Sequence, residues 1–584
     1  MKRISAILLS AISVFFVACQ APSSNEHICS YTLQKAEQRF LKTEATCEEK
    51  SKYFYSCECG KMGEKTFSYG VLGDHDYTAQ IATDEYLKTV ANCQEPAVYY
   101  KSCATCGQKA YGNNTFTSGT TGDCAYVNEV VADKYLKSEA TQSEQAVYYK
   151  SCVCGGTDTA VFYYGDKLKE FSAEEKIPYT PTSLTVTLYD AENSIYGFTW
   201  NTSSKPLRPV IQIQEGNELT DERQEYSAEV EQASSYDTDN NAITYYIVKA
   251  EIKLNANKTY TYRAYDKYVE IGTAHTTIKA KDTEATSFTF SHVSDTQTAG
   301  STYTGSHFGK TLAEIVKTND FIVHSGDVVE NSKYEVQWTS MLNDNFNYLS
   351  TIPMMAISGN HETTYKNGSN ETFKHFHNKI PTQNSTEKGY YYSFVYGNAK
   401  FIMLNTNNLV SNKLETAQYN WLVEELKNNK STWTIVVLHN PMYSVGKYGA
   451  NPSSNSIALA LRAQLQSVFA QYGVDIVLQG HDHTVSRTYP INGDGQPQTE
   501  TFVEQNGVNY SKNPSGVVYM MNGPGGNDRR DEYEIDSSLY AYADGSNACS
   551  WAEFEVSTSS IKVTSKYVKN GVVTNYYTWG IIKG

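Results

Sequence analysis

The segment FIVHSGDVVE, residues 321–330, joins an apolar stretch to a charged loop. Residues 321–325 have the aromatic and β-branched composition of a buried strand. Gly326 and Asp327 follow directly, so a carboxylate stands where the strand ends. A single aspartate in that place usually caps a turn. Whether this one does more depends on the residues at the ends of the other strands.

Four other apolar segments end in the same way. The donor groups after them are Asp295-Thr296-Gln297 (after 288–294), Gly359-Asn360-His361-Glu362 (after 353–358), His439-Asn440-Pro441 (after 433–438) and Gly480-His481-Asp482-His483 (after 474–479). Helix-like stretches at 312–316 and 334–348 lie between the first three of the five strands. Five strand ends that carry oxygen or imidazole donors indicate one rim of a β-sheet core. The glycine-rich loop 522–526 is expected over the same rim.

This ordered set of motifs resembles the calcineurin-like metallophosphoesterase superfamily, and the segment that precedes it makes purple acid phosphatase-like enzymes the nearer relatives. The resemblance covers ~178–584 and its motifs are specific. It implies an α+β fold class, with a four-layer α/β/β/α domain at residues 287–584. The alternating segment 551–582 is expected to supply closing strands of that domain.

The resemblance also implies a pair of metal ions bridged by one carboxylate. The implied ligands of the first ion are Asp295, Asp327 and His483, and those of the second are Asp327, Asn360, His439 and His481. Carboxylate and imidazole ligands suit Fe, Mn or Zn. Two such ions about 3.5–4 Å apart stabilise both the attacking and the leaving oxygen in displacement at phosphorus. The implied nucleophile is a metal-bridging hydroxide.

Two further residues carry implied catalytic roles, and two others depart from the family pattern. His361 matches the position that donates a proton to the leaving group or binds phosphate, and Arg487 is a candidate for contact with the substrate oxyanion. Gln297 stands where the superfamily often has histidine, and an amide oxygen is the poorer ligand. Glu330 stands where purple enzymes carry tyrosine, so no purple colour is expected. Ligation by Gln297 and Glu330 is left open.

Residues 178–285 predict a β-sandwich. Pro178 and Pro181 indicate a linker, and about seven short alternating segments follow: 183–189, 196–202, 209–214, 228–233, 244–254, 259–265 and 270–279. This number and spacing suit a fibronectin type III-like or immunoglobulin-like domain. The segment 254–263 resembles the N-terminal domain of purple acid phosphatases. The domain is interpreted as a spacer.

Three small Cys/Tyr-rich repeats precede the sandwich, within residues 20–170. Their bounds are 29–74, 75–122 and 123–166, and AVYYKSC at 97–103 recurs at 146–152. The four matching positions hold Cys29, Cys47, Cys57 and Cys59 in the first repeat, His75, Cys93, Cys103 and Cys106 in the second, and Cys124, Gln142, Cys152 and Cys154 in the third.

Two explanations fit these cysteines. Four sulfur or nitrogen ligands suit structural Zn²⁺, and histidine replaces cysteine in a zinc site but not in a disulfide. Exported chains, however, usually oxidise their thiols, and small extracellular modules often need disulfides. The third repeat lacks a fourth ligand of its own, because Gln142 takes that position. Zinc and disulfides therefore both stay open, with free thiols as the remaining alternative.

Residues 1–19 predict a bacterial lipoprotein signal peptide. Lys2 and Arg3 precede the apolar stretch 4–18, which is too short for a membrane-spanning helix. FVAC at 16–19 resembles a lipobox, which implies lipidation of Cys19. We therefore expect an exported chain, anchored by lipid at the outer face of a cell membrane.

Composition limits the partners. The 584 residues carry a net charge of −15, and a general nucleic-acid binder would need a cationic surface. No such binding is expected, whereas a phosphoester substrate stays compatible because bound metal ions supply positive charge locally. The leading hypothesis is a surface-anchored phosphatase or phosphodiesterase. The alternative is a non-catalytic, adhesin-like binding protein whose metal site is structural.

Overall fold

The computed structural model describes residues 28–584 except 92, 94, 122–123, 141–143, 168, 298–305, 364–370, 382–389, 408, 451–455, 527–535, 537 and 545–547. The chain divides into two compact units, one of Met1–Lys137 and Val147–Tyr163, the other of Ser138–Ala146 and Tyr164–Gly584. The expected signal peptide, including Cys19, lies outside the described residues. Among the helices that are described, none has the length and apolar character needed to cross a bilayer.

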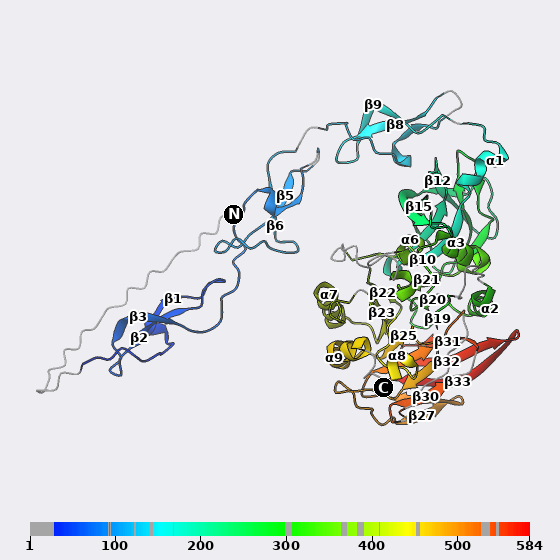
Figure 1. Ribbon diagram of the computed structural model, residues 1–584. Helices are drawn as coiled ribbons and strands as arrows, with labels where there is room; N and C mark the ends of the chain where they lie inside the picture. The colour runs from blue at the N-terminus through cyan, green and yellow to red at the C-terminus, as the bar shows by residue number, and fades with distance from the viewer. Residues whose placement is uncertain are drawn as a thin grey trace, which may run out of the picture. The chain divides into compact units, whose positions relative to one another are not determined.

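Three small three-stranded sheets of similar design lie in the repeats (Figure 1), and the first two are antiparallel. In each sheet a 3-10 turn leads into a short strand, and a stacked aromatic pair joins the next two strands: Tyr53–Phe67, Tyr99–Phe116 and Tyr148–Phe162. Each pair gives one tyrosine of its repeat a packing role across two strands. The strands are β1 (Leu41–Thr43), β2 (Lys52–Ser56) and β3 (Met62–Ser68); β4 (Leu87–Thr89), β5 (Ala97–Tyr100) and β6 (Thr115–Ser118); and β7 (Leu136–Ser138), β8 (Ala146–Ser151) and β9 (Thr157–Tyr164).

The second unit begins with a β-sandwich. After α1 (Ala173–Lys176), four strands pair in the order β10-β11-β15-β14, and the facing sheet has the order β13-β12-β16-β17, with β18 also on β16. The expected strand at 270–279 is two short strands, because both β17 and β18 pair with β16 at different places. The bounds are β10 (Thr182–Asp190), β11 (Ile195–Thr202), β12 (Pro209–Glu215), β13 (Gln224–Ser227), β14 (Glu229–Tyr236), β15 (Ala242–Lys253), β16 (Thr259–Asp266), β17 (Ile271–Gly272) and β18 (Thr276–Lys279).

Two larger sheets follow in the second unit. The eight-stranded sheet has the order β21-β20-β19-β31-β32-β33-β28-β27, and the seven-stranded sheet the order β22-β23-β24-β25-β29-β26-β30. The segment 551–582 supplies central strands of the first sheet, as expected. The strand bounds are β19 (Phe288–Val293), β20 (Phe321–His324), β21 (Met354–Ala356), β22 (Tyr392–Tyr396), β23 (Ala399–Met403), β24 (Trp433–Val437), β25 (Ile476–Gln479), β26 (Val485–Thr488), β27 (Phe502–Gln505), β28 (Val508–Lys512), β29 (Val518–Asn522), β30 (Tyr540–Asp544), β31 (Cys549–Val556), β32 (Ser560–Lys569) and β33 (Val572–Ile582).

Helices cover the outer faces of both sheets (Figure 1). On the first sheet, Ile322 faces a cluster that contains α2 and α3 side chains, whereas its neighbours Phe321 and Val323 face the space between the sheets. On the second sheet, Val436 packs with α7 and α9 side chains. Alternation along the strands therefore builds four layers, α/β/β/α. The helices are α2 (Ser306–Ile315), α3 (Glu335–Asp344), α4 (Phe346–Leu349), α5 (Asn360–Thr363), α6 (Glu371–His375), α7 (Thr416–Lys427), α8 (Lys447–Ala450) and α9 (Ser456–Gln471).

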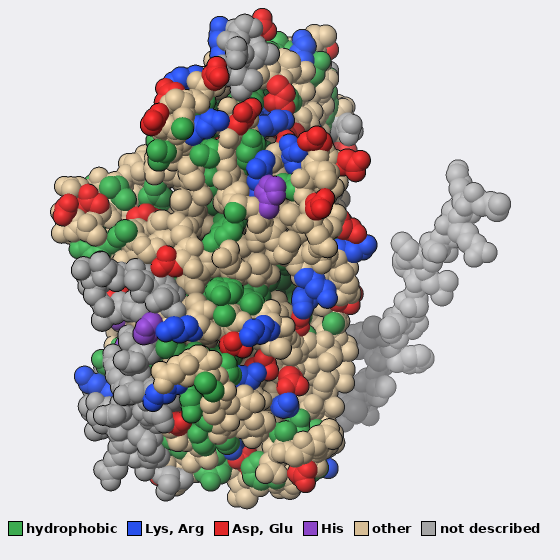
Figure 2. All heavy atoms as spheres, turned by 90° about the vertical axis from the view of Figure 1, so that its right-hand side faces the viewer, with side chains coloured by type: hydrophobic (Ala, Val, Ile, Leu, Met, Phe, Trp, Pro, Cys, Tyr) green, Lys and Arg blue, Asp and Glu red, His purple; other side chains and the backbone are tan. Residues whose placement is uncertain are grey.

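A buried polar contact joins the sandwich to α3 and α6. The side-chain amide of Asn201 on β11 donates to Glu335 Oε1 at 3.0 Å, and His375 Nε2 lies 3.7 Å from Glu335 Oε2. Glu335 is 7% exposed and His375 is fully buried. A charge on either group would lack solvent, so this contact favours the neutral forms. On the face that Figure 2 shows, acidic and basic side chains are interspersed.

Replacing Glu335 with glutamine is expected to flatten the pH dependence of stability. Burial raises the pKa of the Glu335 carboxyl to about 8 from 4.5. The carboxyl therefore stays protonated in the folded chain at pH values where it ionises in the unfolded chain, and stability falls as the pH rises from 4.5 toward 8. Calorimetry should show a wild-type melting temperature that drops by several degrees between pH 5 and 8, and a smaller drop for Glu335→Gln. Equal drops would contradict this assignment.

Candidate metal centre

The donor residues predicted from the sequence follow strands that share one rim. The strands β19, β20 and β21 are parallel neighbours in the first sheet, and β24 and β25 are parallel neighbours in the second. Parallel strands present their carboxyl ends on the same edge. The residues that follow these five ends are therefore brought to one place: Asp295, Asp327, Asn360, His439, His481 and His483.

Side-chain distances show that these residues meet. His439 Nε2 lies 3.3 Å from Asp327 Oδ2 and 2.9 Å from Asn360 Oδ1. Donor atoms of Asp327, His439 and His481 all lie within 4.8 Å of one another. In the neighbouring group, His483 Nε2 lies 3.5 Å from Asp295 Oδ1. These contacts bring together members of both ligand sets that the sequence predicted, and metal ligation by them stays a prediction.

The backbone is strained at three of these residues. Asp295, Asp327 and His481 have φ values of 54°, 57° and 75°. Residues other than glycine rarely adopt this left-handed region, and such strain persists where the surrounding structure imposes it. Each of these residues stands within three residues of the end of a strand, so the sharp turn aims its side chain into the rim.

Glycine at 359 is required by the close approach of two loops. A Cβ atom on Gly359 would lie 2.0 Å from Asp327 Oδ1 and 2.3 Å from the Asp327 backbone nitrogen. The loop 522–526 approaches the rim in the same manner. Its Gly525 N–H donates to the Ser294 carbonyl at 2.7 Å, and a Cβ there would overlap Val293. The expected position of this loop is confirmed.

Hydrogen bonds fix the orientation of two imidazoles. His439 Nδ1 donates to the Ser325 carbonyl at 2.8 Å, and His361 Nδ1 donates to the Glu330 carbonyl at 2.6 Å. A carbonyl oxygen only accepts, so Nδ1 carries the proton in both rings. The Nε2 atom of His439 is left to act as a ligand, as is usual for histidines around metals. The Nε2 atom of His361 lies 3.8 Å from Asp327 Oδ2.

Glu362 is a positioning residue to which the sequence interpretation assigned no role. Its buried carboxylate accepts the backbone N–H groups of Asp327 and Val328 at 2.9 Å, of Val329 at 3.2 Å and of Gly359 at 2.6 Å. One side chain thus holds the loop that presents Asp327 against the loop that presents the next ligand. Only its place in the Gly-Asn-His-Glu motif could have drawn attention to it.

Glu362→Gln is expected to destabilise this rim. Glutamine keeps the size of the side chain but offers one acceptor oxygen and turns an NH₂ group toward backbone N–H groups. Unsatisfied buried donors cost roughly 1–3 kcal/mol each, and more beside a charge. We expect a loss of about 2–4 kcal/mol in the free energy of unfolding in urea, together with lower metal content. The exposed Glu192→Gln serves as the control, and an equal effect in both variants would contradict the assignment.

The electrostatics of the centre favour cations. Asp295 and Asp327 are 0% and 1% exposed. Burial alone would raise the pKa of the Asp327 carboxyl, but the neighbouring imidazoles of His439, His361 and His481 together outweigh burial and lower the pKa below its usual value. Both aspartates are therefore ionised in a setting that excludes solvent, and such charges are retained where they are paired or coordinate metals. Carboxylate, amide and imidazole donors together fit Fe, Mn or Zn.

Gln297 lies beside this centre. Its Nε2 atom is 3.4 Å from Asp327 Oδ2, and its Oε1 atom is buried without a hydrogen-bond partner. An orphaned carbonyl oxygen next to buried carboxylates fits ligation of a cation. Ligation by Gln297 stays a prediction.

The structure does not bring Arg487 to the centre, and the prediction that it contacts substrate is corrected. Arg487 lies on β26, where its guanidinium donates to both oxygens of Glu500 at 2.8 and 3.0 Å and to Tyr577 Oη at 2.9 Å. The ring of Trp579 also lies 4.4 Å from its guanidinium carbon. Four residues beyond His483 the chain is already inside a strand, so Arg487 is buried in packing between strands.

Asp482 was quoted in the sequence motif without a role, and it anchors α8. Its carboxylate accepts the backbone N–H groups of Tyr448 and Gly449 at 3.0–3.2 Å. The Tyr448 ring then lies 4.1 Å from the imidazole of His481. Tyr448 therefore borders the centre, and no motif in the sequence indicated it.

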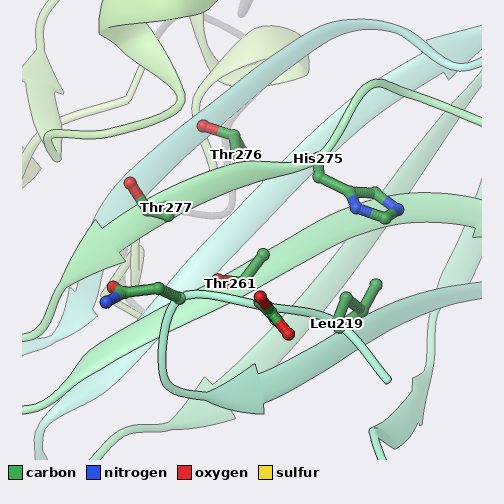
Figure 3. A pocket seen from close by; sticks show the side chains of 7 residues that line it. Leu219, Thr261, His275, Thr276 and Thr277 are labelled. Atoms are coloured by element: carbon green, nitrogen blue, oxygen red, sulfur yellow. The ribbon is translucent and has the colours of Figure 1, made fainter. Parts of the chain in front are cut away.

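A separate surface pocket lies on the sandwich (Figure 3). Leu219, Thr261, His275, Thr276 and Thr277 are among the residues that line it. None of its lining residues belongs to the predicted ligand set.

Comparisons with known proteins agree with the geometry. Residues 288–485 match the family model calcineurin-like phosphoesterase. The chain is 28% identical over 200 residues to purple acid phosphatase 15 of Arabidopsis thaliana (33% of this chain and 33% of that protein). It is 26% identical over 236 residues to the probable inactive purple acid phosphatase 1 of the same plant (37% and 36%). The chain thus spans about a third of the length of these relatives.

A solved structure shows the fold. Purple acid phosphatase PPD1 from yellow lupin superimposes with a TM-score of 0.57 at 18% identity, over 69% of this chain and 74% of that one. One of the sequence relatives is named as inactive, so the activity of this chain depends on its own residues. Residues 288–485 thus match the calcineurin-like phosphoesterase model, and the mixed, sheet-rich fold of the chain is similar to that of a purple acid phosphatase.

Proposed function

We propose that this chain hydrolyses phosphate esters at a two-metal centre. The observation that carries the proposal is the meeting of Asp327 with His439 and Asn360 beside the Asp295–His483 pair, at the joined rim of two sheets. Bound metal ions would activate water and neutralise the charge that develops on the phosphoryl oxygens. Asp327 lies at the junction of both groups, where one carboxylate can hold two ions.

His361 is the group placed to move a proton. Its side chain is 28% exposed, whereas those of Asp327 and His439 are buried. The Glu330 carbonyl holds Nδ1–H, which leaves Nε2 facing the centre from its open side. In the imidazolium form this atom donates a proton to the leaving oxygen of the ester.

We place the enzyme outside the cell, held to the membrane by lipid on Cys19. The support is the charged, apolar and FVAC sequence of residues 1–19. Labelled fatty acid should enter the wild type and be absent from Cys19→Ala. Incorporation into Cys19→Ala at the wild-type level would contradict the anchor.

Phosphate release from aryl phosphate mono- and diesters tests the activity. The full chain, supplied with Fe, Mn or Zn in turn, is expected to turn over at least one substrate class. Full metal occupancy without turnover of any ester would contradict the proposal and favour the non-catalytic alternative. The departures at Gln297 and Glu330, together with a relative that is named as inactive, are the observations behind that alternative.

A further inference from the structure

The cysteines of the repeats gather in groups that cross the repeat boundaries. One group consists of Cys47, His75, Cys103 and Cys106, and the other of Cys93, Cys124, Cys152 and Cys154. In both, the four ligand atoms lie within 4.8 Å of one another. Each group takes three residues from one repeat and one residue from the repeat before it.

The positions of the cysteines in the sequence show the same sharing between consecutive repeats. Cys47 and Cys93 occupy the second of the four matching positions in their repeats, and both are used by the next repeat. The third repeat has no following copy, and its second position is Gln142 rather than cysteine. Residues 138–146 belong instead to the second unit, where Glu139 accepts a hydrogen bond from Lys267 at 3.0 Å. Cysteine therefore occurs at this position only where a partner repeat follows.

We propose that each of these two groups binds one Zn²⁺ and that the zinc ions link consecutive repeats. Tetrahedral Zn²⁺ with Zn–S bonds of about 2.3 Å separates its ligand atoms by about 3.8 Å. The observed separations are 3.4 Å for Cys47–Cys103 and 3.3 Å for Cys106 Sγ to His75 Nδ1. In the second group they are 3.6 Å for Cys93–Cys152 and 4.0 Å for Cys124–Cys154. Cys152 and Cys154 lie closer, at 2.7 Å, and Cys93 is bonded to Cys154, so these two contacts have to open for a zinc ion to enter.

The local backbone suits metal ligation. Cys103 and Cys152 are 2% and 3% exposed, and each begins a tight turn that returns the chain after Cys106 or Cys154. A glycine with positive φ closes each turn, Gly107 at 75° and Gly155 at 80°. Such a turn places its two cysteine side chains next to each other, as in structural zinc sites.

Disulfides account for the groups less well. A disulfide joins Cys93 to Cys154 in one group, but the matching residues Cys47 and Cys106 are reduced. The group with His75 has three sulfur atoms, as does a third group of Cys29, Cys57 and Cys59. A disulfide in a group of three leaves one thiol over, and imidazole has no part in it. Zinc uses every ligand, and in the first group the thiol protons go to solvent without an oxidant. In the second group zinc and the Cys93–Cys154 disulfide exclude each other: zinc binds the four thiols of the newly made chain, and an oxidised chain first needs a thiol reductant that supplies two electrons to break the S–S bond.

Zinc released by a mercurial reagent tests the proposal on the full chain. The reagent displaces zinc from thiolates and not from the carboxylate and imidazole ligands of the catalytic centre, so the result does not depend on phosphatase activity. The wild type is expected to release at least two equivalents, measured with a colorimetric chelator. Cys124→Ser should lose one of these equivalents, and Cys124→His should keep it because the other group already uses histidine there.

Two more variants separate sites between repeats from sites within a repeat. Cys47→Ser and His75→Ala should each lose one equivalent, and the double variant should lose the same one, because both residues serve one ion. Sites within a repeat would instead make the double variant lose two and leave Cys124→Ser unchanged. Gln142→Ser should release as much zinc as the wild type. The proposal is overturned by a double loss in the double variant, by full release from Cys124→Ser, or by no release from the wild type.

Discussion

Asp327→Asn is expected to lower the turnover of aryl phosphates by about a thousandfold, which corresponds to roughly 4 kcal/mol of transition-state stabilisation. Asparagine keeps the shape of the side chain and removes the negative charge that lies between His439, 3.3 Å away, and the backbone N–H of His361 at 2.9 Å. A neutral amide holds two cations poorly, so the metal content should also fall.

The exposed Asp239→Asn is the matched control, because it makes the same chemical change outside the set of predicted ligands. It should leave both turnover and metal content unchanged. If Asp327→Asn retains more than a tenth of the wild-type turnover, the bridging role is wrong. A variant that keeps its metals but loses turnover would show that the charge acts on the reaction rather than on binding.

His361→Asn is expected to lower kcat by about a hundredfold, within the range that general acids contribute. Asparagine can still donate to the Glu330 carbonyl, as Nδ1 does at 2.6 Å, but it lacks the Nε2 atom that faces the centre. The loss should grow with the pKa of the leaving group, because a poor leaving group depends more on proton donation. An alkyl phosphate should therefore suffer more than 4-nitrophenyl phosphate.

The control for this change is His275→Asn on the exposed edge of the sandwich. It should not affect kcat for either ester. An equal loss on both esters for His361→Asn would contradict proton donation and favour a role in binding the phosphate group. Unchanged metal content in the variant is needed for either interpretation.

Much of the centre could be predicted from the sequence because its signals are local. A buried strand followed by a donor residue is visible within ten residues, and Asp295, Asp327, Asn360, His439, His481 and His483 all follow that pattern. Parallel pairing then brings the strand ends to one rim.

What the sequence did not reveal depends on contacts between distant segments. Glu362 acts through backbone N–H groups of a loop more than thirty residues away, and no spacing rule predicts such a contact. The prediction that Arg487 contacts the substrate was wrong for the opposite reason. Its distance along the chain from His483 is short, but its guanidinium is satisfied by Glu500, which only the pairing of strands brings near.

The repeats show the same limit. Alignment of the three copies located the four matching positions in each repeat. It suggested that the ligands of one site all come from one repeat. Cys47 instead lies 3.4 Å from Cys103 of the following copy. The absence of cysteine at Gln142 was visible in the sequence, but its meaning depends on that contact.

Anomalous diffraction from crystals of the metal-loaded chain is the most direct test of the two-metal centre. We expect two peaks about 3.5–4 Å apart, one on each side of the Asp327 carboxylate, with His439 and His483 on different ions. A single peak, or a pair that Asp327 does not bridge, would contradict the account.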